Sequence, residues 1–146
     1  MGRLERIWIK RAHRGPMDPV ASGVLDADKG LQRSANYGGR RQVTIISAER
    51  WAAMMGELKS DVDPSARRAN LLVSGIDLAE TRDRELRVGG CVLRISGETR
   101  PCERMEEAHE GLQKAMRPLW GGGAWAQVIE GGEIHVGDDV SWIVTS

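Results

Sequence analysis

The chain has 146 residues with 21 basic and 21 acidic side chains, so its formal net charge is zero. This length suits one domain with a sizeable core, and we expect a single domain over residues 1–146. The neutral balance, one tyrosine and no phenylalanine argue against a nucleic-acid partner, because charge and aromatic stacking both drive such binding. No apolar run approaches the roughly 18 residues that cross a bilayer, so no membrane partner is expected.

Two features favour a cytoplasmic location. The first residues lack the apolar stretch of a signal peptide. The two cysteines, Cys91 and Cys102, have neither close spacing nor a secretory context. They therefore indicate a reducing cytosol rather than a disulfide framework.

The first half of the chain predicts short strands separated by loops. Residues 4–10 alternate imperfectly between apolar and polar, which is typical of a strand, and residues 20–25 suggest another. Residues 26–39 are polar and contain glycine, so we expect a long loop there. The β-branched run at 42–47 is the clearest strand, and residues 71–73 predict a further one.

A helix is expected after the strand at 42–47. The Ser47 hydroxyl can accept a hydrogen bond from the open N–H groups of a first helical turn. Apolar side chains then recur at helical spacing, at Trp51, Met54, Met55 and Leu58. This stripe indicates core packing rather than a ligand site.

Glycine pairs mark two expected hairpins in the second half. The alternating runs at 85–96 meet at the pair 89–90, where a tight turn needs positive φ. The same arrangement at 125–136 surrounds the pair 131–132 and precedes a last strand at 140–144. We therefore expect consecutive strands to pair with each other.

One further helix completes the expected fold. Apolar residues between positions 105 and 119 fit a single helix face. The predicted class is mainly β: an antiparallel β-barrel closed by these strands, with two or three short helices.

The stretch from Thr99 to Arg104 carries the main chemical signal. Pro101 cannot extend a sheet ladder, and Cys102 follows it at the start of the second helical pattern. A helix N-terminus and the flanking Arg100 and Arg104 would favour the reactive thiolate. The alternative is a small buried hydrophobe, since free cysteine is among the most buried residue types.

Cys91 calls for a different interpretation. It shares strand parity with Leu93 and Ile95, so its side chain should face the core with theirs. We expect Cys91 to be structural, protonated and inert.

Other familiar sites are missing from the sequence. It has no phosphate loop and no dinucleotide fingerprint. The three histidines are scattered and lack zinc-ligand spacing. Arginines gather at 40–41, 67–68 and around Cys102, and their planar forks suit phosphate. They favour a shared anion pocket, with solvated surface charge as the alternative for each.

Five stretches, in order, resemble the MOSC domain family, named for the C-terminal domain of molybdenum cofactor sulfurase. They are the loop at 23–30, the strand at 41–47, the segment at 67–78 with Arg-Arg-Ala-Asn, the region 86–102 ending in Pro-Cys, and the last hairpin at 128–138. Their order together with Pro101-Cys102 makes the match specific. The resemblance implies a β-rich barrel, in agreement with the strand pattern.

The resemblance also implies roles for individual residues. Cys102 would be the family's characteristic cysteine, whose thiolate carries sulfur or coordinates the molybdenum of a pterin cofactor. Arg68 and Asn70 match the Arg-x-Asn motif that helps hold the pterin and its phosphate in cofactor-binding relatives. Asp28 matches the acidic residue of a Gly-Asp loop motif, but Ala27 replaces the glycine and leaves the role of Asp28 open.

Three functions remain open at this point. The leading hypothesis is a molybdenum-cofactor (molybdopterin) binding domain with Cys102 as catalytic residue and metal ligand, surrounded by Arg68, Asn70, Thr99, Arg100 and Arg104. It would reduce N-hydroxylated compounds with electrons from an electron-donor protein. The second hypothesis is a sulfur carrier whose Cys102 accepts a persulfide from a cysteine desulfurase. The third is a non-catalytic small-anion-binding module in which Cys102 is buried.

Overall fold

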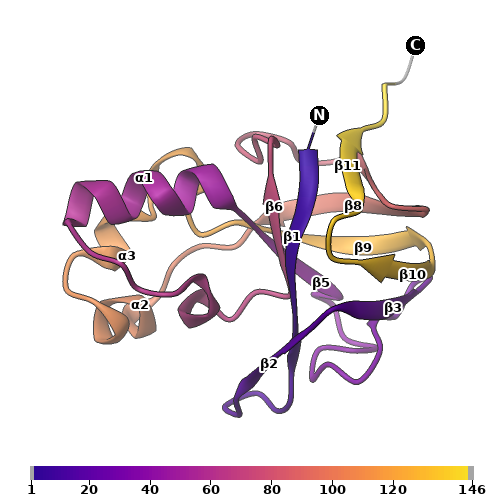
Figure 1. The fold of residues 1–146 in the computed structure, drawn as a ribbon, viewed down its shortest axis with the longest axis horizontal. Helices are drawn as coiled ribbons and strands as arrows, with labels where there is room; N and C mark the ends of the chain where they lie inside the picture. Colours follow the sequence, from indigo (N-terminus) through magenta and orange to yellow (C-terminus); the bar gives the residue numbers. More distant parts are fainter. Residues whose placement is uncertain (1, 145–146) are drawn as a thin grey trace.

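Seven strands close into a barrel in the computed structural model, which describes residues 2–144 (Figure 1). In barrel order they are β11 (Asp139–Trp142), β7 (Glu85–Val88), β8 (Cys91–Glu98), β9 (Ala124–Glu130), β5 (Val43–Ser47), β6 (Leu71–Ser74) and β1 (Gly2–Lys10). The first residues of β1 pair with β11 and close the barrel, while its last residues pair with β2 (Met17–Val20). The predicted mainly β barrel is confirmed.

The pairing within the barrel is mixed rather than purely antiparallel. β5 and β6 run parallel, with Ile45 opposite Leu71. Their connection contains α1 (Ala48–Leu58) and the 3-10 helix η1 (Pro64–Arg67), and such a crossover is what a parallel pair requires. These two consecutive strands do pair with each other, but the expected antiparallel direction is wrong for them.

A second, three-stranded sheet accounts for two further differences from the strands expected from the sequence. It contains β10 (Gly132–His135), β3 (Ser22–Asp26) and β4 (Gly30–Leu31). The strand expected at 20–25 is therefore two strands in different sheets. The hairpin expected at the pair 131–132 is also wrong, because β10 pairs with β3 while β9 pairs with β8 and β5. A Cβ on Gly131 would lie 2.4 Å from the Leu25 carbonyl oxygen, so glycine permits the close crossing between sheets.

The first helix begins where the sequence predicts. The Ser47 hydroxyl accepts a hydrogen bond from the Arg50 N–H at 3.2 Å and caps α1. The helix ends at Lys59 in the left-handed conformation. Trp51 and Met54 are buried against the helices that follow Cys102.

The single helix expected over 105–119 is instead three short pieces. They are α2 (Glu103–Ala108), α3 (Leu112–Ala115) and the 3-10 helix η2 (Pro118–Trp120). Gly111, with a φ of 85°, interrupts the helix between α2 and α3. Both short helices pack on the same hydrophobic cluster as α1. Their apolar residues therefore have the spacing expected of one continuous helix face. No helix in residues 2–144 is long and apolar enough to cross a membrane.

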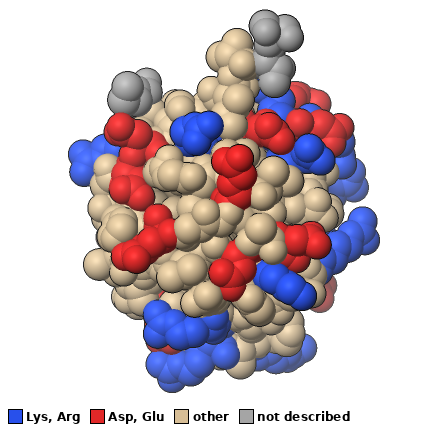
Figure 2. All heavy atoms as spheres, turned by 90° about the vertical axis from the view of Figure 1, so that its right-hand side faces the viewer, with Lys and Arg blue, Asp and Glu red and all other residues tan. Residues whose placement is uncertain are grey.

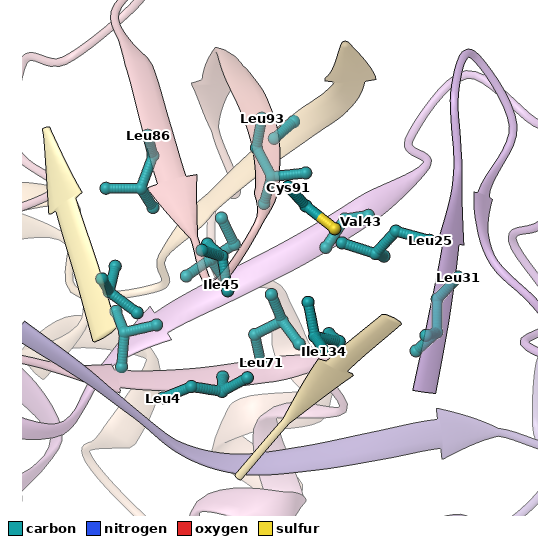
Figure 3. Close-up of a cluster of buried hydrophobic side chains, with 14 of the residues drawn as sticks. Leu4, Leu25, Leu31, Val43, Ile45, Leu71, Leu86, Cys91, Leu93 and Ile134 are labelled. Carbon is teal, nitrogen blue, oxygen red and sulfur yellow. The ribbon is translucent and has the colours of Figure 1, made fainter. Parts of the chain in front are cut away.

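The barrel interior is a continuous apolar core. The hairpin predicted at 85–96 is confirmed, with Val88 opposite Cys91 and Gly89 at a φ of 56°. Cys91 is 0% exposed and lies among apolar side chains that include Leu25 and Leu93 (Figure 3). Strand parity therefore placed this thiol correctly.

The three helices gather on one side of the barrel (Figure 1). The opposite face carries acidic and basic side chains interspersed with each other (Figure 2). Such a mixture of both signs is ordinary for a protein surface.

Candidate functional site

A cavity of about 370 Å³ opens between the end of β1, the loop that follows it, η1 and the segment between β8 and α2. The residues that line it are Lys10, His13, Asn36, Arg41, Thr44, Arg67, Arg68, Ala69, Thr99, Arg100, Cys102, Arg104, Met105 and Gly122. Six of them are lysine or arginine, and these described lining residues include no aspartate or glutamate. The cavity therefore concentrates positive charge in a chain whose net charge is zero.

The cations of the cavity act on each other. Burial lowers the pKa of Lys10, and Arg68, Arg67, Arg104 and Arg41 lower it further. Burial and the charge of Arg104 likewise lower the pKa of Arg68. A bound anion would relieve this repulsion, so the electrostatics favour a negatively charged ligand.

Cys102 stands at the wall of this cavity. It is an exposed free thiol at the N-cap of α2, and its side chain makes no capping hydrogen bond. Its backbone carbonyl accepts from the Met105 N–H at 2.9 Å, which starts the helix. The alternative of a buried Cys102 is therefore wrong.

Cys91 has the opposite surroundings. Burial raises the pKa of its thiol, and the charges of Asp138 and Glu130 raise it further. The neutral thiol is thus the favoured form in the core.

The two residues of the Arg-x-Asn motif occupy different places. Arg68 lines the cavity, and its Nη2 donates to the carbonyl oxygens of Ala12 at 3.3 Å and His13 at 3.2 Å. Asn70 is 1% exposed and is not among the lining residues. The motif therefore contributes one side chain to the cavity and one to the framework behind it.

Asn70 uses its whole amide within the protein. Its Oδ1 accepts from the backbone N–H and the hydroxyl of Thr44, at 3.1 and 3.2 Å. Its Nδ2 donates to the Trp8 carbonyl and to the Ser34 hydroxyl, each at 3.2 Å. Asn70 thus fixes Thr44, which does line the cavity.

Thr99, Arg100 and Arg104 all line the cavity. The Thr99 hydroxyl oxygen is buried and has no hydrogen-bond partner within the described part of the chain. The Arg100 side chain is 88% exposed and lies 4.0 Å from the Glu98 carboxylate. Arg104 is exposed on the first turn of α2. The two arginines are therefore accessible to a ligand.

Asp28 lies elsewhere, in the turn between β3 and β4. Its backbone N–H donates to the Val128 carbonyl at 2.9 Å, and its Oδ1 accepts from Gln42 Nε2 at 3.4 Å. Asp28 itself takes the left-handed conformation, with a φ of 59°, whereas Ala27 is not among the residues with positive φ. The loop therefore tolerates alanine at position 27, and Asp28 is not among the residues that line the cavity.

Sequence reasoning missed several lining residues as site residues. Arg41 and Arg67 belong to the arginine pairs noted in the sequence, but nothing local ranked them above other surface arginines. Lys10 ends a strand and Thr44 lies inside one, and neither position carries a sequence signal for ligand binding. Only closure of the barrel brings these residues to Cys102.

The MOSC domain family matches residues 32–141 of the chain. The chain belongs to the MOSC family. Among solved structures, the YuaD protein from Bacillus subtilis has a TM-score of 0.80 and 20% sequence identity, covering 96% of this chain and 94% of that one. YiiM from Geobacillus stearothermophilus has a TM-score of 0.77 and 15% identity, covering 99% of this chain and 76% of that one. These likenesses show a shared fold.

YiiM from Escherichia coli shares the fold as well, with a TM-score of 0.71 and 15% identity. The match covers 99% of this chain and 71% of that one. Comparison with curated proteins found no match.

Proposed function

We propose that this MOSC domain binds a molybdenum–pterin cofactor in its cation-lined cavity and that Cys102 is the protein ligand of the metal. The observation that carries the proposal is the meeting of an exposed thiol with six cations in one cavity whose described lining includes no carboxylate. Phosphate binds well to guanidinium groups, and molybdenum is matched by a thiolate donor. The donor set therefore fits both ends of such a cofactor.

The residues divide the work by their chemistry. Arg68, Arg104 and Lys10 would hold the anionic groups, because all three line the cavity and their positive charges act on each other there. The Thr99 hydroxyl, buried without a partner among the described residues, would donate to the ligand. Asn70 would contribute indirectly, because its hydrogen bonds hold Thr44 in position at the cavity wall.

When bound, the metal supplies oxidation–reduction chemistry. We propose that the substrate class is N-hydroxylated compounds and that a partner protein supplies the electrons. The chain would then be the oxidoreductase component of a small electron-transfer system in the cytoplasm. Its own contribution is to orient the cofactor, to hold Cys102 beside it and to leave the thiol side of the cavity accessible.

A second candidate function is sulfur transfer. The exposure of Cys102 favours it, because a cysteine desulfurase could present its persulfide directly to this thiol. Cys102 would then carry the sulfur to an acceptor, and the surrounding cations would stabilise the persulfide anion. This function needs partner access to Cys102 but no resident metal.

One purification separates the two functions. Protein from a host that makes the cofactor should contain molybdenum and pterin in near-equal amounts with the polypeptide. Cys102→Ser should retain less molybdenum than wild type, while Cys91→Ala, altered only in the core, should retain the wild-type amount. If wild-type protein lacks both molybdenum and pterin, the cofactor proposal fails. A gain of one sulfur atom on Cys102 after incubation with a desulfurase and cysteine would then support the carrier.

A further inference from the structure

Cys102 lies on a segment with no regular structure of its own. Residues 99–102, here called the cysteine strap, connect β8 to α2. At its start the Thr99 N–H donates to the Gly123 carbonyl at 2.9 Å, and at its end the Cys102 carbonyl accepts from α2. Between these points the strap needs other contacts to hold one conformation.

A single arginine from a distant element supplies them. Arg67, the last residue of η1, donates from Nη2 to the Thr99 carbonyl at 3.0 Å and to the Arg100 carbonyl at 3.4 Å. Its Nε donates to the Gly122 carbonyl at 2.8 Å. One guanidinium thus joins the strap to the segment that leads into β9.

The strap also fits closely against Gly122. A Cβ at this position would lie 2.3 Å from the Thr99 carbonyl oxygen, 3.2 Å from Arg67 Nη2 and 3.3 Å from Pro101 Cδ. Any side chain here would push the strap away from its place. Arg67 and Gly122 therefore fix the strap from two sides.

The positive charge of Arg67 also interacts with the Cys102 sulfur. Burial lowers the pKa of Arg67, whereas the negative charge of a Cys102 thiolate raises it and Arg41 lowers it. No ion pair joins Arg67 to a carboxylate within residues 2–144, so backbone carbonyls take its hydrogen bonds and its positive charge stays uncompensated.

We infer that Arg67 is the positioning residue for Cys102: its guanidinium fork holds the cysteine strap so that the thiol faces the cations of the cavity. The inference rests on the proposed use of Cys102 as the reactive sulfur, but the position of the thiol can be measured without any ligand. Lysine cannot replace the fork, because it carries a single ammonium and cannot reach carbonyls on two segments in the same fixed plane.

The test compares alkylation of Cys102 by iodoacetate, an anion, with alkylation by neutral iodoacetamide. Both reagents need the thiolate, so the ratio of their rates reports the electrostatic surroundings of the sulfur rather than its degree of ionisation. Arg67→Lys keeps the charge and loses the fork. Arg68→Lys is the matched control, because Arg68 lines the same cavity and donates to the loop after β1 instead of the strap.

We expect the rate ratio at Cys102 to fall by about threefold or more in Arg67→Lys and by less than about twofold in Arg68→Lys. Gly122→Ala, which displaces the strap while leaving Arg67 intact, should also lower the ratio. Equal ratios in Arg67→Lys and wild type would overturn the inference.

Labelling of Cys91 in the same samples reports the fold. If Cys91 in Arg67→Lys becomes accessible, Arg67 holds the whole domain together rather than the strap, and the positioning role is likewise overturned. Molybdenum content does not enter this test, so failure of the proposed cofactor function leaves its outcome unaffected.

Discussion

The two cysteines lie at either end of β8 and its continuation, yet their surroundings are opposite. Cys91 opens the strand inside the barrel core, fully buried among apolar side chains (Figure 3). Cys102 follows the end of the strand on an irregular strap, exposed beside a cation-lined cavity. The barrel thus holds one thiol in its core and presents the other on the segment that leaves it.

The Arg-x-Asn motif is likewise split between the core and the cavity, with Asn70 buried and Arg68 in the cavity lining. Substitutions at these two residues should give the largest difference in effect. Asn70→Ala would leave several buried groups unpaired, including the Thr44 N–H and the Trp8 carbonyl. We expect it to lower the free energy of unfolding by about 2–4 kcal/mol, measured by urea denaturation.

Arg68→Ala is the paired control. It removes a partly exposed side chain that lines the cavity, so we expect a stability loss below about 1 kcal/mol together with weaker anion binding. If the two variants lost similar stability, the division of the motif into framework and cavity residues would be wrong.

The second prediction tests whether the cavity, rather than arginine content in general, binds anions. Arg104→Gln should weaken binding of inorganic phosphate by about three- to tenfold, because one charge-assisted contact is lost. Isothermal titration calorimetry at low ionic strength measures the change. Arg87→Gln removes an exposed arginine on β7, remote from the cavity lining, and should leave the affinity unchanged. Equal effects would indicate diffuse surface binding.

The smallest expected effect concerns the crowding of positive charge. The pKa of Lys10 is lowered from 10.5 in the native state, so the folded protein holds this proton less tightly than the unfolded chain does. At pH values below the native pKa, the protonated lysine therefore lowers the free energy of unfolding. This destabilisation disappears as the pH rises from the native pKa toward 10.5, the value of the unfolded chain.

Lys10→Met keeps the apolar stem and removes the charge. We expect it to raise the free energy of unfolding at neutral pH by less than about 1 kcal/mol, since solvent screens a partly exposed group. The gain should shrink as the pH approaches 10.5. Lys29→Met, at an exposed turn, is the control. A gain that stays constant with pH would exclude charge repulsion as its cause.

The features that the sequence predicted correctly depend on local rules. The cap at Ser47, the turn at Gly89 and the inward face of Cys91 each follow from residues a few positions apart. The hairpin at the pair 131–132 failed because a glycine pair also allows two strands to separate, and the approach of Leu25 decides between these outcomes. That approach is a long-range contact, which local patterns do not contain.

The same limit applies to the site. The resemblance to the family identified Cys102 and Arg68, which the structure brings to one cavity. It also named Asn70, which lies behind the cavity, and Asp28, whose role it left open and which lies elsewhere. Lys10 and Thr44 reach the cavity only through the pairing of β1 and β5 with β6. Arg67 looks like any surface arginine until its three carbonyl partners are placed around it.

The central claim is that Cys102, and not Cys91, donates its sulfur to molybdenum. X-ray absorption at the molybdenum edge, on protein loaded with the cofactor, tests it most directly because the technique counts the sulfur neighbours of the metal. We predict one fewer sulfur neighbour in Cys102→Ser than in wild type, with Cys91→Ala unchanged. An identical sulfur shell in wild type and Cys102→Ser, or wild-type protein that takes up no molybdenum, would contradict the account.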